Sequence, residues 1–410
     1  MHLEAGKDLI MLSPPAFSAE LRLLAACVLL DDAAVLQALR APIDWHRFGQ
    51  LAKYNDVQGL AGKRLRGLPS PPPVPAVIMD DLHAALREDA IMHLSQTAES
   101  ARLIALLDKA GISALVLKGA AVAQQLYGGD PECRRSSDID ILIGEADLDA
   151  ADRALVSGGF RRSWPEGEPP RHGRDMFLQL ANVFNYVHPQ TRQLIELHHR
   201  ITLNPYWLPV SFAALFAESE AVDTRFGSFR CVSGDPLVSY LSWHALSHGD
   251  YRLKWFGDLV RALRREQQAS LAACLARDSR PLERNPSVLA DGIVHVLTGG
   301  RLGVEAPDSW GKAVAQVVAD MDEAVDTPTK RSLARLPREI ANLRFVMRLS
   351  SHWRGKAYAV LRTVSDPRDA ELLGLGVRWA WLYGLLGPLL AVRRFLLGLL
   401  GVVPPASSDH

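Results

Sequence analysis

The spacing of apolar residues predicts helices in the first quarter of the chain. From about 18 to 68, apolar residues recur at three- and four-residue intervals, as in LRLLAACVL, which places them on one face of each helix. The proline-rich stretch SPPPVP (70–75) should end this region. A longer helical pattern then runs from 76 to about 110, and Gly111 follows where a helix would terminate.

Short apolar runs replace this pattern over the next hundred residues. Runs such as SALVLKG and DIDILIG predict buried strands rather than helices. The predicted elements are strands at 113–119, 138–144, 177–187 and 193–200, and helices at 120–127 and 147–157. After Asp235, a candidate N-cap followed by Pro236, the pattern is helical almost to the end of the chain.

These elements predict an α+β fold, in which a small mixed β-sheet is flanked by N-terminal and C-terminal helical regions. A chain of 410 residues is too long for one ordinary core. We expect four parts, which are an N-terminal helical region (1–75), an α+β core (76–234), a C-terminal helical domain (235–371), and an apolar helical segment with a tail (372–410).

Charge and cysteine content indicate which partners and which cellular compartment to expect. The chain has 46 basic and 46 acidic residues, so its overall charge carries no strong nucleic-acid signature. Its four cysteines form no CxxC pair, which fits a reducing compartment better than a zinc site or a disulfide framework. Acidic residues stand near the N-terminus, where a signal peptide would be basic. We therefore expect a cytoplasmic protein.

The most apolar part of the chain is the segment 372–403. Between Arg378 and Arg393 it reads WAWLYGLLGPLLAV, which is shorter than the roughly 20 residues that a spanning helix needs. We favour a helix hairpin packed on the protein itself. The aromatic residues at one end and the arginines at the other also suit peripheral contact with a membrane or a partner protein.

Two aspartates open the predicted strand at 138–144. Residues two apart on a strand face the same side, so Asp138 and Asp140 present paired carboxylates while the isoleucines between them fill the other side. Such a pair is repulsive unless a cation or a proton lies between the carboxylates, and oxygen ligands of this kind suit Mg²⁺. Replacing either aspartate by asparagine should relieve the repulsion and leave the fold intact. Two surface acids at a strand edge would give the same pattern.

Other polar residues at strand ends extend this pattern. Lys118 and Gly119 directly precede a helix, where backbone amides could approach a phosphate and the lysine could add a charge. A plain turn would look the same. Glu196 is central in LIELH and would be a third carboxylate if its strand neighbours the first. His198 points the same way, either toward a nucleotide or, as we favour, as a hydrogen-bonded residue that orients the glutamate.

Taken in order, the motifs LVLKGAAVAQQLY, DIDILI and IELHHR resemble the uncharacterised bacterial nucleotidyltransferase family, within the nucleotidyltransferase superfamily that has the DNA polymerase β-like fold. The resemblance covers about 18–263. It implies an enzyme that uses Mg²⁺ (or Mn²⁺), held by Asp138, Asp140 and Glu196. The reaction it implies moves a nucleoside monophosphate from a nucleoside triphosphate, with ATP as the expected donor, to an unknown hydroxyl-bearing acceptor and releases pyrophosphate. Glu196 could also act as general base.

The chain departs from the superfamily pattern after the glycine. Serine usually follows it, and Ala120 stands there instead, so Lys118 or backbone amides must bind the phosphate. The loop before the first aspartate contains Arg134, Arg135 and Ser137. Arg135 and Ser137 are candidate nucleotide-binding residues, although a solvated loop would have the same composition.

The stretch SYLSWHALSHGDYRLKWFGDLVRAL (239–263) resembles the family's second signature and predicts one helix. His244 and His248 lie four apart on it, and Lys254 and Asp258 form a second such pair. In the catalytic interpretation His244, Lys254 and Asp258 contact the nucleotide. In the alternative, the histidines are buried structural residues and the second pair is a surface ion pair.

A different class of function is a non-catalytic module that binds nucleotide or metal, or a scaffold of a biosynthetic complex. Three retained carboxylates favour an enzyme, because a module without catalysis has no need of all three.

Overall fold

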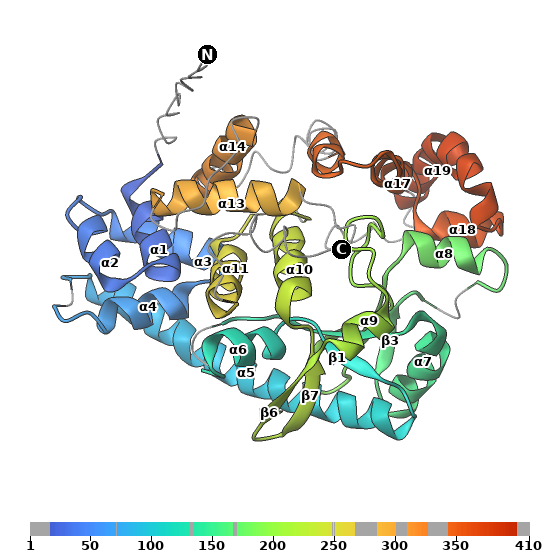
Figure 1. Cartoon of the computed structure of the whole chain (residues 1–410), viewed down its shortest axis with the longest axis horizontal. Coiled ribbons are helices and arrows are strands. Elements are labelled where there is room, and N and C mark those ends of the chain that lie inside the picture. Colours follow the sequence, from blue (N-terminus) through green and yellow to red (C-terminus); the bar gives the residue numbers. More distant parts are fainter. Residues whose placement is uncertain are drawn as a thin grey trace, which may run out of the picture.

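The computed structural model describes most of the chain. The described residues are 17–70, 72–130, 134–166, 170–247, 249, 251–266, 285–300, 310–326 and 343–399. The N-terminal helices lie at one end of the longest axis and the last helices lie at the other end, with the sheet between them (Figure 1).

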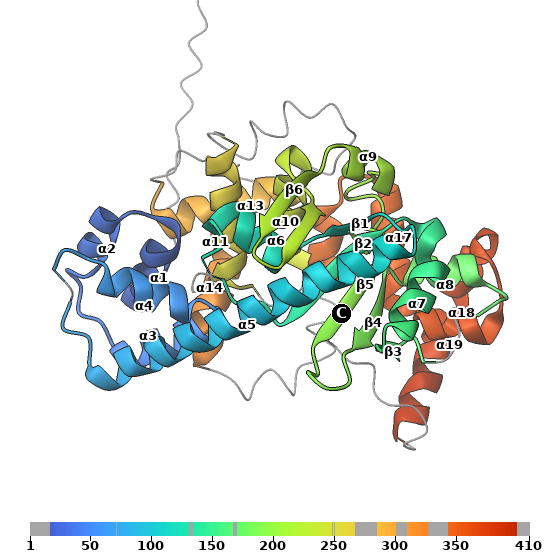
Figure 2. The ribbon, with the colours of Figure 1, turned by 90° about the horizontal axis from the view of Figure 1, so that it is seen from below.

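Four helices form the beginning of the described chain, as the apolar spacing predicts. They are α1 (Ala19–Leu29), α2 (Asp32–Ala38), α3 (Trp45–Tyr54) and α4 (Gln58–Arg66). Side-chain oxygens of Ser18, Asp31 and Asp44 accept backbone N–H groups in the first turns of α1 to α3, which satisfies donors that a helix leaves unpaired. The long helix α5 (Ala76–Lys109) follows the prolines and runs from these helices across the sheet (Figure 2).

Seven strands of the described chain form one mixed sheet, which confirms the α+β prediction. They are β1 (Ala114–Val116), β2 (Asp138–Ile143), β3 (Arg161–Trp164), β4 (Val183–Val187), β5 (Leu194–His198), β6 (Glu220–Thr224) and β7 (Gly227–Cys231). Their order is β3-β4-β5-β2-β1-β7-β6. Strand β2 is antiparallel to β1 and parallel to β5. Helices α6 (Ala120–Tyr127) and α7 (Leu148–Ser157) lie where the sequence predicts them.

Parts of the sheet differ from the prediction. The run at 177–180, expected to begin a strand, ends helix α8 (Arg174–Leu180), and the strand starts only at Val183. Short apolar runs do not distinguish a buried helix from a buried strand. Strands β3, β6 and β7 lie outside the predicted strands, because most of their residues are exposed or half-buried and give no apolar run. The short helix α9 (Phe212–Ala217) precedes β6.

The C-terminal half is helical, as predicted, but the helix expected at 239–263 is divided. Helices α10 (Gly234–Ser247) and α11 (Leu253–Arg265) are separated near Gly249, whose φ is +63°. His248 lies outside the described residues. Further helices are α13 (Asn285–Thr298), α14 (Gly311–Asp322), α17 (Trp353–Val364), α18 (Pro367–Leu373) and α19 (Ala380–Leu399). Residues 343–349 are also helical, and 3-10 turns lie at 145–147, 323–325 and 377–379.

Hydrophobic clusters lie on both faces of the sheet. One cluster joins residues of α1 to α4 with residues of α10, α11, α13 and α14, and it includes Leu142 of β2. The other contains Ile139 and Ile141 and packs against α5, α7 and α8. Successive residues of a strand alternate between faces. Asp140 therefore faces the first cluster, on the side of the sheet that α10 and α11 cover (Figure 1).

The apolar C-terminal segment folds as α18 and α19, up to the last described residue. Among the described residues, no single helix is long and apolar enough to cross a membrane, although α18 and 377–394 meet that test together, with a bend of 99° between them. Helix α19 packs on α17 and exposes its opposite face. Residues 400–403 of the predicted segment lie outside the described residues.

Candidate active site

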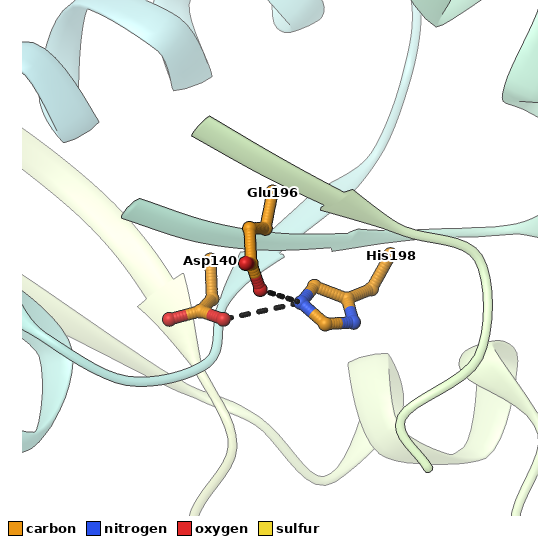
Figure 3. A group of neighbouring side chains, drawn as sticks. All are labelled: Asp140, Glu196 and His198. Carbon is orange, nitrogen blue, oxygen red and sulfur yellow. Dashed lines mark hydrogen bonds and ion pairs between the residues drawn. The ribbon is translucent and has the colours of Figure 1, made fainter. Parts of the chain in front are cut away.

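The two acidic strands predicted from the sequence are neighbours. Strands β2 and β5 pair in parallel, with Asp140 opposite Glu196 and Leu142 opposite His198. Register partners on adjacent strands point to the same side of a sheet, so the two carboxylates lie side by side (Figure 3). The expectation that the glutamate strand adjoins the aspartate strand is confirmed.

His198 bridges the two carboxylates. Its Nε2 lies 3.1 Å from Asp140 Oδ1 and 3.4 Å from Glu196 Oε2 (Figure 3). Burial acts to lower the pKa of His198, but the hydrogen bonds to Asp140 and Glu196 outweigh it and raise that pKa to about 9. The imidazole is therefore protonated at neutral pH. It supplies a positive charge between two carboxylates that would otherwise repel.

Glu196 is ionised in this arrangement. Burial acts to raise its pKa, but the hydrogen bond from His198 and the charge of Lys118 lower the pKa to about 2. A carboxylate with so low a pKa is a weak base and a good ligand for a cation.

Lys118 adds a second positive charge. Its Nζ lies 2.9 Å from Asp140 Oδ1, and both side chains are buried. Burial acts to lower the pKa of Lys118, but the nearby acids, with Asp140 foremost, hold the pKa well above its usual value. Lys118, the candidate phosphate contact at the end of the first strand, therefore contacts the acidic pair.

Asp140, Glu196 and His198 lie close enough together to hold a metal ion. Each offers one ligand atom, and these atoms lie within 4.8 Å of one another. The second oxygen of Asp140, Oδ2, is buried and has no hydrogen-bond partner among the described residues. A buried polar atom without a partner is costly, so this oxygen is where a bound cation would be expected. The two carboxylates fit Mg²⁺ or Mn²⁺, whereas His198, protonated in this arrangement, would have to lose its proton before its Nε2 could bind a cation.

Asp138 lies at the edge of this group rather than within it. It is half-buried at the start of β2, and the Ser136 hydroxyl donates to its Oδ1 at 3.2 Å. Its charge still acts on Lys118 and Glu196, which places it close to the site. Ser137, beside it, is exposed.

Gly119 makes the turn between β1 and α6. Its φ of +56° and ψ of −115° form a conformation that few residues other than glycine adopt. A Cβ atom at Gly119 would come within 3.3 Å of Ser136 Oγ and 3.5 Å of the Asp138 carbonyl oxygen. The turn thus places the first amides of α6 close to the start of β2, where they could bind a phosphate.

Arg134 and Asp258 support this turn from inside the protein. Arg134 is buried and donates to Asp258 through Nε at 3.0 and 3.1 Å and through Nη2 at 2.9 Å. Its Nη1 donates to the Gly119 carbonyl at 3.4 Å, and Tyr127 donates to Asp258 at 2.8 Å. The alternative of a solvated loop is wrong for Arg134. Asp258, a predicted nucleotide-binding residue, is fully buried in this network.

Lys254 does not pair with Asp258, so the alternative in which the two residues form a surface ion pair is wrong. Its Nζ lies 2.9 Å from Asp56 Oδ2, and Arg252 donates to the same oxygen at 2.6 Å. Burial, the largest influence, lowers the pKa of Lys254. Spacing along a helix could not reveal this partner, because Asp56 belongs to the N-terminal region.

The other two candidates also have partners within the protein. Arg135 is half-exposed, and its Nη1 lies 3.2 Å from Asp89 Oδ1 of α5. His244 is buried and stacks on Tyr240, with ring centroids 6.0 Å apart. It also meets Trp255 edge-on at 5.2 Å.

The sequence reasoning missed two residues near the acidic pair. Asn185 lies opposite Glu196 in the β4–β5 pairing and is buried, so Asn185, Glu196 and Asp140 form one row across the sheet. The signal was an asparagine inside the apolar run VFNYV. Tyr240 of α10 interacts electrostatically with Lys118, and its own pKa is raised, chiefly by burial. Nothing in the helical sequence around Tyr240 indicated that it lies near the acidic pair.

Comparison with known proteins agrees with this geometry. Residues 41–290, more than half of the chain, match the family described as uncharacterised nucleotidyltransferase. No curated protein and no solved structure matches the chain. The matched range contains β2, β5 and the turn at Gly119, and the resemblance found in the motifs is confirmed. The chain belongs to the uncharacterised nucleotidyltransferase family, and its activity is nucleotidyl transfer.

Proposed function

We propose that this protein transfers a nucleoside monophosphate from a nucleoside triphosphate, with ATP as the expected donor, to a hydroxyl group of an acceptor, and that the reaction needs a divalent metal and releases pyrophosphate. The observation that carries the proposal is the buried Oδ2 of Asp140, which has no hydrogen-bond partner in the described part of the chain and belongs to the strand next to that of Glu196. An oxygen in that position gains most from a cation.

Asp140 and Glu196 are the proposed metal ligands, with Asp138 completing the set from the edge of the site. When bound, Mg²⁺ or Mn²⁺ would neutralise charge on the triphosphate and lower the pKa of the acceptor hydroxyl. Before binding, protonated His198 and Lys118 offset the charges of the carboxylates. The sequence alone does not show whether the carboxylates repel each other or are neutralised by neighbouring positive charges.

Each of the other site residues then has a specific task. Lys118 holds its charge where the triphosphate would approach Asp140, and Gly119 lets the first amides of α6 approach a phosphate. The low pKa of Glu196 favours the role of ligand over that of general base. Arg134 and Asp258 act as positioning residues, because Arg134 donates to the Gly119 carbonyl and Asp258 holds Arg134 in place.

Arg135, Ser137, His244 and Lys254 are proposed as further nucleotide contacts. Arg135 and Lys254 already have carboxylate partners, Asp89 and Asp56. A nucleotide phosphate would have to compete with those partners. Ser137 is exposed beside Asp138, where its hydroxyl could donate to a phosphate.

Pyrophosphate release tests the proposal. The full chain is incubated with Mg²⁺ and each of the four ribonucleoside triphosphates, with and without a small-molecule extract, and products are examined by mass spectrometry for an added nucleotide. We expect release with a divalent metal, no release with a chelator, and loss of release in Asp140→Asn. Nucleotide binding without turnover in every condition would favour the non-catalytic module instead.

A further inference from the structure

Helix α19 is fixed to the protein along one face. Tyr383 is fully buried, and its hydroxyl donates to the Leu375 carbonyl at 2.7 Å. Gly387 lies so close to α17 that a Cβ would come within 2.6 Å of the Val364 carbonyl oxygen. Arg394 forms an ion pair with Asp369 of α18. These contacts hold the helix on the protein surface.

The opposite face of α19 is exposed and apolar. Its large side chains are between 51% and 69% exposed. They are Trp381, Leu385, Leu389, Val392 and Leu396, which we name the α19 stripe. Positions spaced three or four apart lie on one side of a helix. The other exposed residues between 381 and 392 are Gly384 and Pro388, so this part of the face offers no polar side chain.

An apolar face of this length requires a partner, and its composition indicates which one. Protein interfaces usually surround an apolar centre with a rim of mixed polar groups, whereas the charged residues of 372–403 are all arginines. No aspartate or glutamate occurs between 372 and 403. Arg378 and Arg393 lie near the two ends of the stripe, and Trp379 packs beside Trp381, with ring centroids 6.2 Å apart. Tryptophan and arginine at the margins of an apolar helix suit the interface of a bilayer with anionic headgroups.

We propose that the α19 stripe rests on the surface of a lipid bilayer that carries anionic lipids. The helix lies along the surface, because its inner face stays attached through Tyr383, Gly387 and Arg394. Docking in this way would hold the enzyme at a membrane through residues far along the chain from the acidic pair. The proposal is independent of the chemistry proposed for the site.

Vesicle co-sedimentation of the full chain tests this proposal. We expect binding to vesicles of phosphatidylcholine mixed with phosphatidylglycerol, and weaker binding to phosphatidylcholine alone. Leu385→Gln combined with Leu389→Gln should lower the affinity at least about tenfold, since each leucine loses its apolar burial. The matched control is Val77→Gln with Ile91→Gln on α5, two side chains 65% and 70% exposed, which should bind as the wild type does.

Charge reversal provides a second test that leaves the stripe intact. Arg378→Glu with Arg393→Glu should remove the preference for phosphatidylglycerol, and circular dichroism should show an unchanged fold. The proposal is overturned if the wild type ignores both vesicles or if the leucine variant binds as well as the wild type. It is also overturned if the wild type is a dimer in solution that the leucine variant converts to a monomer, because a second copy would then cover the stripe.

Discussion

Replacing Asp140 by asparagine should affect stability and activity through separate causes. Asp140 is fully buried, and its Oδ1 lies 2.9 Å from Lys118 Nζ and 3.1 Å from His198 Nε2. The neutral amide would leave the Lys118 ammonium without its nearest anion. Breaking a buried ion pair on one side costs about 3–5 kcal/mol, which is a large share of the roughly 5–15 kcal/mol by which domains are stable.

The structure thereby reverses an expectation drawn from the sequence. Two aspartates on one face suggest that Asp140→Asn relieves repulsion and spares the fold. The lysine and the histidine already offset that repulsion, so the substitution removes attraction instead. The free energy of unfolding, measured in urea without metal, should fall by about 3–5 kcal/mol.

A double-mutant cycle separates stability from catalysis. Lys118→Met together with Asp140→Asn removes both charges, so the double variant should be more stable than the sum of the single losses predicts, by about 1–3 kcal/mol. Nucleotidyl transfer should stay at least about 10³-fold below the wild type in Asp140→Asn and in the double variant, because a group that stabilises the transition state is missing. If the double variant transfers nucleotide as fast as Lys118→Met alone, Asp140 has only a structural role and the reasoning fails.

Three further substitutions test the surroundings of the site. Gly119→Ala should lower the free energy of unfolding in urea by about 1–3 kcal/mol, because the Gly119 φ of +56° disfavours a residue with a Cβ. An unchanged midpoint of the urea transition would contradict this. Arg134→Met should cost about 3–5 kcal/mol by stranding Asp258, and Arg102→Met, a surface control, should cost little. Burial raises the pKa of Asp89 to about 6. The protonated carboxyl therefore stabilises the fold below about pH 4, and this stabilisation is lost as the pH rises through 6. In Asp89→Asn, the corresponding fall in melting temperature with rising pH should disappear.

The centre of the site was predictable because strands impose a simple rule. Alternation places Asp138 and Asp140 on one face, and an acid at the centre of LIELH indicated a second strand of the same kind. The parallel pairing of those strands then fixes Asp140 opposite Glu196. The sequence placed Lys118 at the end of a strand as a candidate phosphate contact, but its ion pair with Asp140 was visible only in the structure.

The surroundings of the site were not predictable because their partners lie far apart in the chain. Asp258 binds Arg134, which precedes it by more than a hundred residues, and Lys254 binds Asp56 from the N-terminal region. Helical spacing suggested instead that Lys254 and Asp258 meet each other. Tertiary contacts overrode this local pairing, which is worth only a few tenths of a kcal/mol. The strands β6 and β7 were missed for a different reason, because most of their side chains are exposed or half-buried and give no apolar run.

Titration of Mn²⁺ into the nucleotide-free full chain, followed by electron paramagnetic resonance, tests the central claim most directly. The wild type and a control with Glu99→Gln, which removes a carboxylate paired with a surface arginine on α5, should bind the ion equally. Asp140→Asn and Glu196→Gln, each verified as folded, should bind it at least about tenfold more weakly. Equal affinity in all four proteins would mean that the paired carboxylates of β2 and β5 do not hold the metal.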